Sequence, residues 1–166
     1  MKYTLKPLTS LDAKSTKDIF EEVFHQDAWR ELGWIWKYRS KKESIGVFNS
    51  TGELLGFALI LPHSRELKYI GIHPKFQLHG FGSILLKDIL KSCVSQRRSL
   101  NLVPANEIVE AWYRRHGFYT SQYFIAKDNT RWSTMNYHSY STRSKNMNYH
   151  PYSTRSKNLK PNYSII

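Results

Sequence analysis

Apolar and polar residues follow two different periods along the chain, and these periods predict where strands and helices lie. Short runs rich in β-branched and aromatic residues predict strands. Longer runs with apolar residues three or four positions apart predict helices. The expected strands span residues 2–8, 44–49, 53–61, 66–72, 100–103, 118–127 and 131–137. The expected helices span residues 9–24, 27–36, 83–96 and 106–117.

The first two expected helices carry many of the large apolar side chains of the N-terminal part. The core face of the first is formed by Leu11, Ile19, Phe20, Val23 and Phe24. The second carries three tryptophans, Trp29, Trp34 and Trp36. These tryptophans suit the wall of a binding pocket or the core beneath a sheet, and the pattern leaves both interpretations open.

The stretch 66–86 combines a strand, a glycine turn and a helix in an order that suits an anion site, or only a tight strand-to-helix connection. The strand ends at His73-Pro74, because proline cannot donate a hydrogen bond to a sheet. Gly80 and Gly82 follow, and the next helix begins at once. The first amides of a helix lack internal partners and carry the positive end of its dipole. The turn has neither the lysine of a P-loop nor the third glycine of a dinucleotide fingerprint.

Two blocks of the sequence, in register with each other, carry a family resemblance. Gln77-x-x-Gly80-x-Gly82 is entered by Ile-x-Ile-His-Pro and left by an apolar helix. This block resembles the acetyl-CoA signature of the GNAT superfamily of N-acetyltransferases. The block from Asn106 through Tyr113 to Gly117-Phe118 is similar to a second motif of that family in order and spacing.

The resemblance implies a fold and an activity. The fold is α/β, of the GNAT acyl-CoA N-acyltransferase type, with a central mixed, mostly antiparallel sheet flanked by helices. The activity is direct transfer of an acetyl group from acetyl-CoA to a primary amine, without a covalent enzyme intermediate. The acceptor stays open among protein lysine, an N-terminal amine, a polyamine and an aminoglycoside. The expected domain spans residues 1–134, and residues 135–166 form a tail.

The resemblance also implies which residues hold the cofactor. Backbone groups at Ile70 and Ile72 are expected along its pantetheine arm. The pyrophosphate is expected among Gln77, Leu78, His79, Gly80, Phe81, Gly82 and Ser83. Asn106 is expected either to contact the arm or only to cap its helix. His79 stands where the family usually has arginine or lysine, so Lys75 or a protonated His79 would have to supply the missing positive charge.

Two residues match positions with catalytic roles in the family. Tyr113 matches the tyrosine that protonates the departing thiolate, and an ordinary tyrosine is still protonated at neutral pH. Its alternative role is packing beside Trp112 and Phe118. Glu66, 11 residues before Gln77, matches the general base of the histone-acetyltransferase branch. Its alternative role is that of a solvated glutamate at the end of a strand.

The charge of the chain is basic and unevenly distributed. The net charge is +12, and residues 129–166 contain six Lys or Arg and no acidic residue. Residues 135–146 and 147–158 are two copies of a polar 12-mer, identical at eleven positions. A basic, tyrosine-bearing tail suits nucleic acid or another acidic partner, which gives an alternative function as a binding module on the same scaffold. Alternatively, the basic charge only keeps the protein soluble, and the repeat is a neutral duplication without a function.

The remaining features bound the setting of the protein. The single cysteine, Cys93, rules out an intrachain disulfide and a cysteine-based zinc site, and it lies on the apolar stripe of its helix. We therefore expect a buried structural thiol. We expect no metal, no membrane span and an intracellular location, cytoplasmic or nuclear. The oligomeric state stays open.

Overall fold

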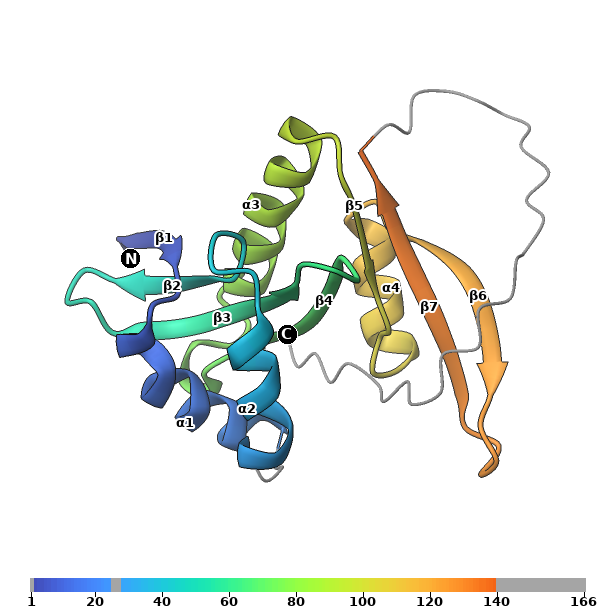
Figure 1. Ribbon diagram of the computed structural model, residues 1–166, viewed down its shortest axis with the longest axis horizontal. Coiled ribbons are helices and arrows are strands. Elements are labelled where there is room, and N and C mark those ends of the chain that lie inside the picture. Colours follow the sequence, from blue (N-terminus) through green and yellow to red (C-terminus); the bar gives the residue numbers. More distant parts are fainter. Residues whose placement is uncertain (1, 25–27, 140–166) are drawn as a thin grey trace.

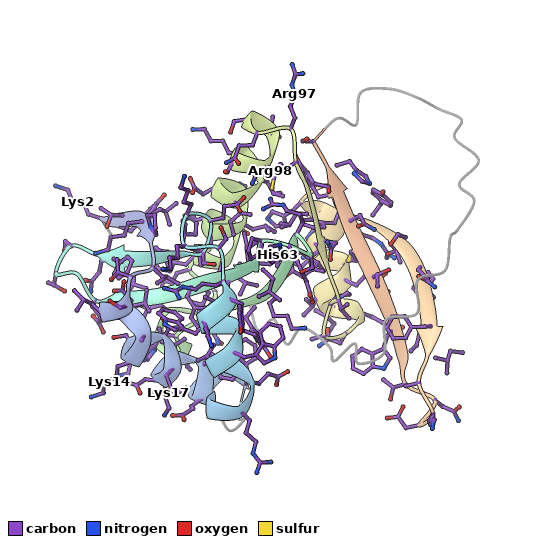
Figure 2. The ribbon with its side chains drawn as sticks, viewed as in Figure 1. Lys2, Lys14, Lys17, His63, Arg97 and Arg98 are labelled. Atoms are coloured by element: carbon purple, nitrogen blue, oxygen red, sulfur yellow. The ribbon has the colours of Figure 1, made fainter. Side chains whose placement is uncertain are left out.

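The computed structural model of the chain describes residues 2–24 and 28–139 (Figure 1). Its seven strands are β1 (Tyr3–Pro7), β2 (Ile45–Asn49), β3 (Leu54–Leu61), β4 (Glu66–Ile72), β5 (Ser99–Leu102), β6 (Tyr119–Ile125) and β7 (Arg131–His138). Its α-helices are α1 (Ala13–Phe24), α2 (Ala28–Tyr38), α3 (Phe81–Ser95) and α4 (Glu107–Arg115). Two short 3-10 turns, η1 (Ser10–Asp12) and η2 (Pro74–Phe76), precede α1 and the glycine turn.

The strands form one mixed sheet in the order β1-β2-β3-β4-β5-β7-β6. All neighbours are antiparallel except β4 and β5, which are parallel. A parallel pair needs a crossover connection, and α3 supplies it. The expected mixed, mostly antiparallel sheet flanked by helices is thus confirmed.

The two halves of the sheet meet at a single residue pair. Glu66 on β4 is registered with Asn101 on β5, and this is the one pair that joins the two strands among the described residues. The junction is tied further, because Asn101 N donates to Arg65 O at 2.9 Å and Asn101 Nδ2 donates to Ser64 O at 2.6 Å. Beyond it, the β5 side of β4 has no strand partner in the described part of the chain.

Helices cover the sheet unequally on its two faces. On one face, α3 and α4 pack with β2, β3, β4 and β5 around a core that includes Leu85, Leu100 and Tyr113. On the other face, α1 and α2 pack over β3 and β4 around Phe20, Ile35 and Tyr69. In Figure 1, α1 and α2 lie over the half of the sheet that holds β2 and β3. Neither helix extends over β5, β7 and β6, so among residues 2–24 and 28–139 no helix covers that face of this half of the sheet, which is called the open face below.

Three sequence-based expectations differ from the structure in detail. Leu11 is 90% exposed, because it lies in the turn η1 before the helix rather than on the core face of α1. Trp34 is 52% exposed on the outer face of α2, so it is not a core residue. The last strand, β7, runs to His138 and so continues past residue 134, the expected end of the domain. Met135 within it is fully buried. The repeat segment from residue 140 lies outside the described residues.

Cys93 is buried on α3, as expected of a structural thiol. The guanidinium of Arg65 lies 3.7 Å from its sulfur through Nη2. Burial raises the pKa of the Cys93 thiol above its ordinary value, although the nearby Arg65 charge acts in the opposite direction. The thiol is therefore protonated and inert at neutral pH.

Candidate active site

The glycine turn ends in a helix N-terminus that can receive an anion. Gly80 precedes α3 with φ 82° and ψ 3°, a left-handed conformation that favours glycine. No atom lies within 4 Å of the position that a Cβ on Gly80 would occupy. The first hydrogen bond of the helix runs from Ile84 N to Gly80 O, so the helix leaves the amides of residues 81–83 without internal partners. This geometry fits a pyrophosphate.

The remaining loop residues hold the turn in shape. Gln77 Nε2 donates to Ile72 O at 3.1 Å, which fastens the loop to the end of β4. Leu78 has φ 62° and is almost fully exposed. His79 Nδ1 donates to Gln77 O at 2.7 Å, and its ring stacks on the buried Phe81 with centroids 6.5 Å apart. The side chains of Gln77 and His79 therefore brace the loop.

Ser83, in the first turn of α3, is linked to a residue that the sequence did not single out. His116, which follows α4, has Nε2 3.2 Å from Ser83 Oγ and Nδ1 2.9 Å from Trp112 O. The ring of Trp112 packs on the imidazole at 4.4 Å. The imidazole thus connects the end of α4 to the start of α3. His116 could have been proposed as a site residue from the sequence, because it lies directly before Gly117-Phe118 in the second sequence block.

Ile70 and Ile72 lie on β4 beyond the junction with β5. Both side chains are buried in the core under α3 and α4. On one side their strand pairs with β3, where Ile70 is registered with Ala58 and Ile72 with Gly56. On the other side of β4, no strand pairs with these two residues in the described part of the chain, and Ile72 O accepts a hydrogen bond from Gln77 Nε2 in the loop. An extended ligand such as a pantetheine arm would lie along this unpaired side.

Glu66 begins β4 and forms an ion pair with Lys68. Lys68 Nζ lies 3.2 Å from Glu66 Oε1, and both side chains are largely buried. They meet because residues two apart on a strand point to the same face. The register of β4 also shifts here, since Leu59 pairs with Tyr69 but Ile60 pairs with Leu67. Lys68 is therefore the extra residue of a β-bulge. The sequence predicted Glu66 as a candidate base, or as a solvated glutamate beside Arg65 and Lys68, whereas the structure places Glu66 and Lys68 in a largely buried ion pair.

Tyr113 lies on the other face of the sheet from Glu66. It is completely buried within α4, with its ring 4.8 Å from Trp112 and 5.3 Å from Phe118. The packing role expected for Tyr113 is therefore present in the structure. The catalytic role stays a prediction.

Asn106 caps α4, because its Oδ1 accepts a hydrogen bond from Val109 N at 3.0 Å. One turn later the buried Glu110 accepts hydrogen bonds from Thr120 at 2.7 Å, Tyr123 at 3.3 Å and Arg114. Burial alone would raise the pKa of Glu110, but the hydrogen bonds from Thr120 and Tyr123 and the Arg114 charge together hold it below the ordinary value. This carboxylate fixes α4 to β6.

Two further observations bear on the class of site. Within residues 2–24 and 28–139, no group of three or more His, Cys, Asp or Glu side chains is arranged to hold a metal ion. The helices in the same part of the chain are too short or too polar to cross a membrane.

Comparisons with known proteins agree with this geometry. Residues 10–118 match the sequence profile described as the acetyltransferase (GNAT) family. No curated protein matches the chain significantly. Ard1 from Thermoplasma volcanium is similar in structure with a TM-score of 0.69 and 18% identity, covering 82% of this chain and 97% of its own.

Two other solved structures are similar in fold. The ribosomal-protein-S18-alanine N-acetyltransferase from Escherichia coli has a TM-score of 0.65 and 19% identity, covering 89% of this chain and 100% of its own. The PaiA N-acetyltransferase from Thermoplasma acidophilum, solved with coenzyme A, has a TM-score of 0.58 and 16% identity, covering 83% of this chain and 99% of its own. With the matching profile, the parted strands and the open helix N-terminus, the chain belongs to the GNAT acetyltransferase family and is an acetyl-CoA-dependent N-acetyltransferase.

Proposed function

We propose that the acceptor is a primary amine of a polypeptide, with a lysine side chain as the first candidate. The amine attacks the thioester carbonyl of acetyl-CoA, so that a C–N bond forms and the C–S bond breaks. The amine loses a proton, and the departing thiolate takes one up. The acceptor must reach the point where β4 and β5 separate.

The observation that carries this proposal is a row of polar residues on the open face of the sheet. Glu66 is registered with Asn101, Asn101 with Asn136, and Asn136 with Tyr119. Directly paired residues point to the same face of a sheet. The neighbours of Asn101 and Asn136 along their strands, Leu100, Leu102 and Met135, belong to the core under α3 and α4. The polar row therefore faces the side that α1 and α2 leave open.

An open face suits a polypeptide better than a small molecule. Sites for small molecules are usually concave and bury most of the ligand. A sheet face with amide and hydroxyl side chains in line instead offers hydrogen bonds along an extended chain. The fold neighbour from Escherichia coli is named for a protein acceptor, ribosomal protein S18, which agrees with an acceptor of this kind.

Within this proposal each candidate residue has one role. Glu66 accepts the proton of the attacking amine, and the Lys68 ammonium holds the carboxylate in place. Tyr113 donates a proton to the thiolate from the opposite face. Residues 77–83 hold the pyrophosphate through the amides of α3.

Release of free coenzyme A thiol, measured with a panel of amines, tests the proposal. The panel contains lysine peptides, the same peptides with a free N-terminus and no lysine, spermidine and an aminoglycoside. We expect the highest kcat/KM for a lysine peptide. Turnover of spermidine or the aminoglycoside above all peptides would overturn the choice of a polypeptide acceptor.

A further inference from the structure

The contact between Ser83 and His116 lies beside the amides assigned to the pyrophosphate. Ser83 is the third residue of α3, and its backbone amide is one of those that the helix leaves without an internal partner. Its hydroxyl lies 3.2 Å from Nε2 of the half-buried His116. An anion that binds the start of α3 is therefore separated from the imidazole by one hydroxyl group.

The hydrogen bonds determine which nitrogen of His116 carries the proton. Nδ1 lies 2.9 Å from the carbonyl oxygen of Trp112. A carbonyl oxygen only accepts, so Nδ1 must be the donor. In the neutral imidazole, Nε2 then has no proton and accepts a hydrogen bond from Ser83. The single hydroxyl proton of Ser83 is consumed by this bond and cannot be given to an anion.

Protonation of His116 reverses this bond. In the imidazolium, Nε2 carries a proton and donates it to Ser83 Oγ. The hydroxyl proton of Ser83 is then released from the histidine and can be donated to a phosphate oxygen. No bond other than hydrogen bonds changes, and the only species taken up is one proton from solvent.

We infer that His116 is a positioning residue of the cofactor site, which acts through Ser83 and couples coenzyme A binding to uptake of a proton. Binding of the anion and protonation of the imidazole favour each other, because such coupling is reciprocal. The imidazolium supplies through Ser83 a positive charge that the loop lacks at His79. The inference rests on the proposed pyrophosphate site at residues 77–83.

The surroundings of His116 leave its charge uncompensated by protein acids. The charged or titratable groups on the elements that meet here are Glu107, Glu110, Tyr113, Arg114 and Arg115 on α4, Lys87, Asp88, Lys91 and Cys93 on α3, Arg131, Tyr137 and His138 on β7 and His79 in the loop. Within the described residues, none of the three acids among these, Asp88, Glu107 and Glu110, forms an ion pair with His116, and Glu110 pairs with Arg114 instead. A bound phosphate would then supply a counter-charge for the imidazolium.

Isothermal titration of the full-length protein with coenzyme A tests the coupling directly. Titrations near pH 7 in two buffers of different ionisation enthalpy give the number of protons taken up on binding. We expect uptake in the wild type to exceed that in His116→Gln and in Ser83→Ala. The matched control His79→Gln removes a second histidine of the same site and should keep the uptake assigned to His116.

The pH dependence of affinity is the second readout. We expect the ratio of Kd at pH 8 to Kd at pH 6 to be about fivefold larger in the wild type than in His116→Gln, the low end of typical couplings. The phosphates of coenzyme A change protonation in the same way whether the wild type or His116→Gln is titrated. The difference in the Kd ratio between the two proteins therefore reports the contribution of His116. In NMR spectra, the His116 ring should titrate at higher pH when coenzyme A is present, and this shift should be absent in Ser83→Ala.

Each result decides the matter. Equal proton uptake by the wild type and both variants, with coenzyme A still bound, would overturn the coupling and leave the cofactor site intact. No binding of coenzyme A to the wild type at either pH would overturn both the site and the coupling. If His116→Gln fails to fold, Ser83→Ala and the NMR titration of the wild type carry the same test.

Discussion

Lys68 Nζ lies 3.2 Å from Glu66 Oε1, at the residue pair where the two halves of the sheet separate. Both side chains are largely buried, with 12% and 14% of their surface exposed. The pair therefore places a neutralised carboxylate, rather than a free negative charge, at the point where β4 and β5 separate. We therefore do not expect this carboxylate to attract a cationic amine by charge alone.

Breaking this pair should cost stability. Lys68→Met leaves a buried carboxylate without its cation, so we expect the free energy of unfolding to fall by about 1–3 kcal/mol. Glu66→Gln together with Lys68→Met should cost less than the sum of the single changes, because the double variant leaves no unpaired charge. Urea denaturation of the four proteins measures the coupling. Additive effects would show that the pair contributes nothing.

Glu66→Gln also separates catalysis from binding. If the carboxylate accepts the proton of the amine, we expect kcat to fall on the order of 10²-fold while the affinity for acetyl-CoA stays unchanged. Single-turnover measurements at saturating acetyl-CoA isolate the chemical step. Glu43→Gln serves as the control, since Glu43 pairs with Arg65 at 2.7 Å. An unchanged chemical step would return Glu66 to a structural role.

Tyr113→Phe should retain cofactor binding and lower turnover by about 10²-fold or more. The substitution removes one hydroxyl from a fully buried ring and keeps the contacts with Trp112 and Phe118. Tyr137→Phe is the matched control, because the ring of Tyr137 packs on Phe118 at 5.6 Å. Equal turnover for the two variants would mean that Tyr113 only packs.

Glu110 should make stability depend on pH in the acid range. Its pKa in the folded protein lies below its ordinary value of 4.5, so its contribution is present above that value. The contribution is lost as the pH falls through the folded-state pKa. We expect the stability difference between the wild type and Glu110→Gln to be constant from pH 6 to 8 and to shrink below about pH 4.5. A difference that grows toward acid pH would contradict this assignment.

Two truncations locate the end of the folded domain. Removal of residues 135–166 deletes half of β7 and the buried Met135, whose loss alone should cost about 2–5 kcal/mol. Removal of residues 140–166 leaves β7 complete, so we expect an unchanged melting temperature. Circular dichroism melts of both proteins measure the difference. Equal melting temperatures would place the boundary at residue 134.

The tail supplies a separate prediction about polyanions. Its five Lys or Arg and interleaved tyrosines should increase affinity for single-stranded nucleic acid. The affinity of the full-length protein should fall more steeply with salt than that of the protein lacking residues 140–166. Fluorescence titrations with an oligonucleotide at several salt concentrations measure both slopes. Equal slopes would leave the repeat without a binding role.

Local rules allow much of this fold to be predicted from the sequence. Gly80 and Gly82 after a proline-ended strand indicate the turn into α3, and Asn106 indicates the start of α4. The core position predicted for Leu11 is wrong, because apolar spacing does not distinguish a 3-10 turn from the first turn of an α-helix. Of the two roles left open for Trp34, the core position is wrong, because residue size says nothing about which face of α2 meets the sheet.

The parts of the site that could not be predicted depend on long-range register. Glu66 and Lys68 are two residues apart and so point to the same face of β4, but their burial and the β-bulge at Lys68 depend on how β4 pairs with β3. Ser83 and His116 are 33 positions apart and meet because α3 and α4 pack on the same face. Sequence spacing identified residues on each element, but contacts between elements required the three-dimensional structure.

The burial of Cys93 has a practical consequence for enzymology. Reagents that detect free coenzyme A react with thiolates, and this protein's one cysteine is both enclosed and protonated. The native enzyme should therefore add almost no background signal to a continuous colorimetric assay. When the domain unfolds, the same side chain becomes reactive. The rate at which the thiol reagent labels Cys93 then reports how often α3, the helix after the glycine turn, opens to solvent. The same assay that measures turnover can record this rate.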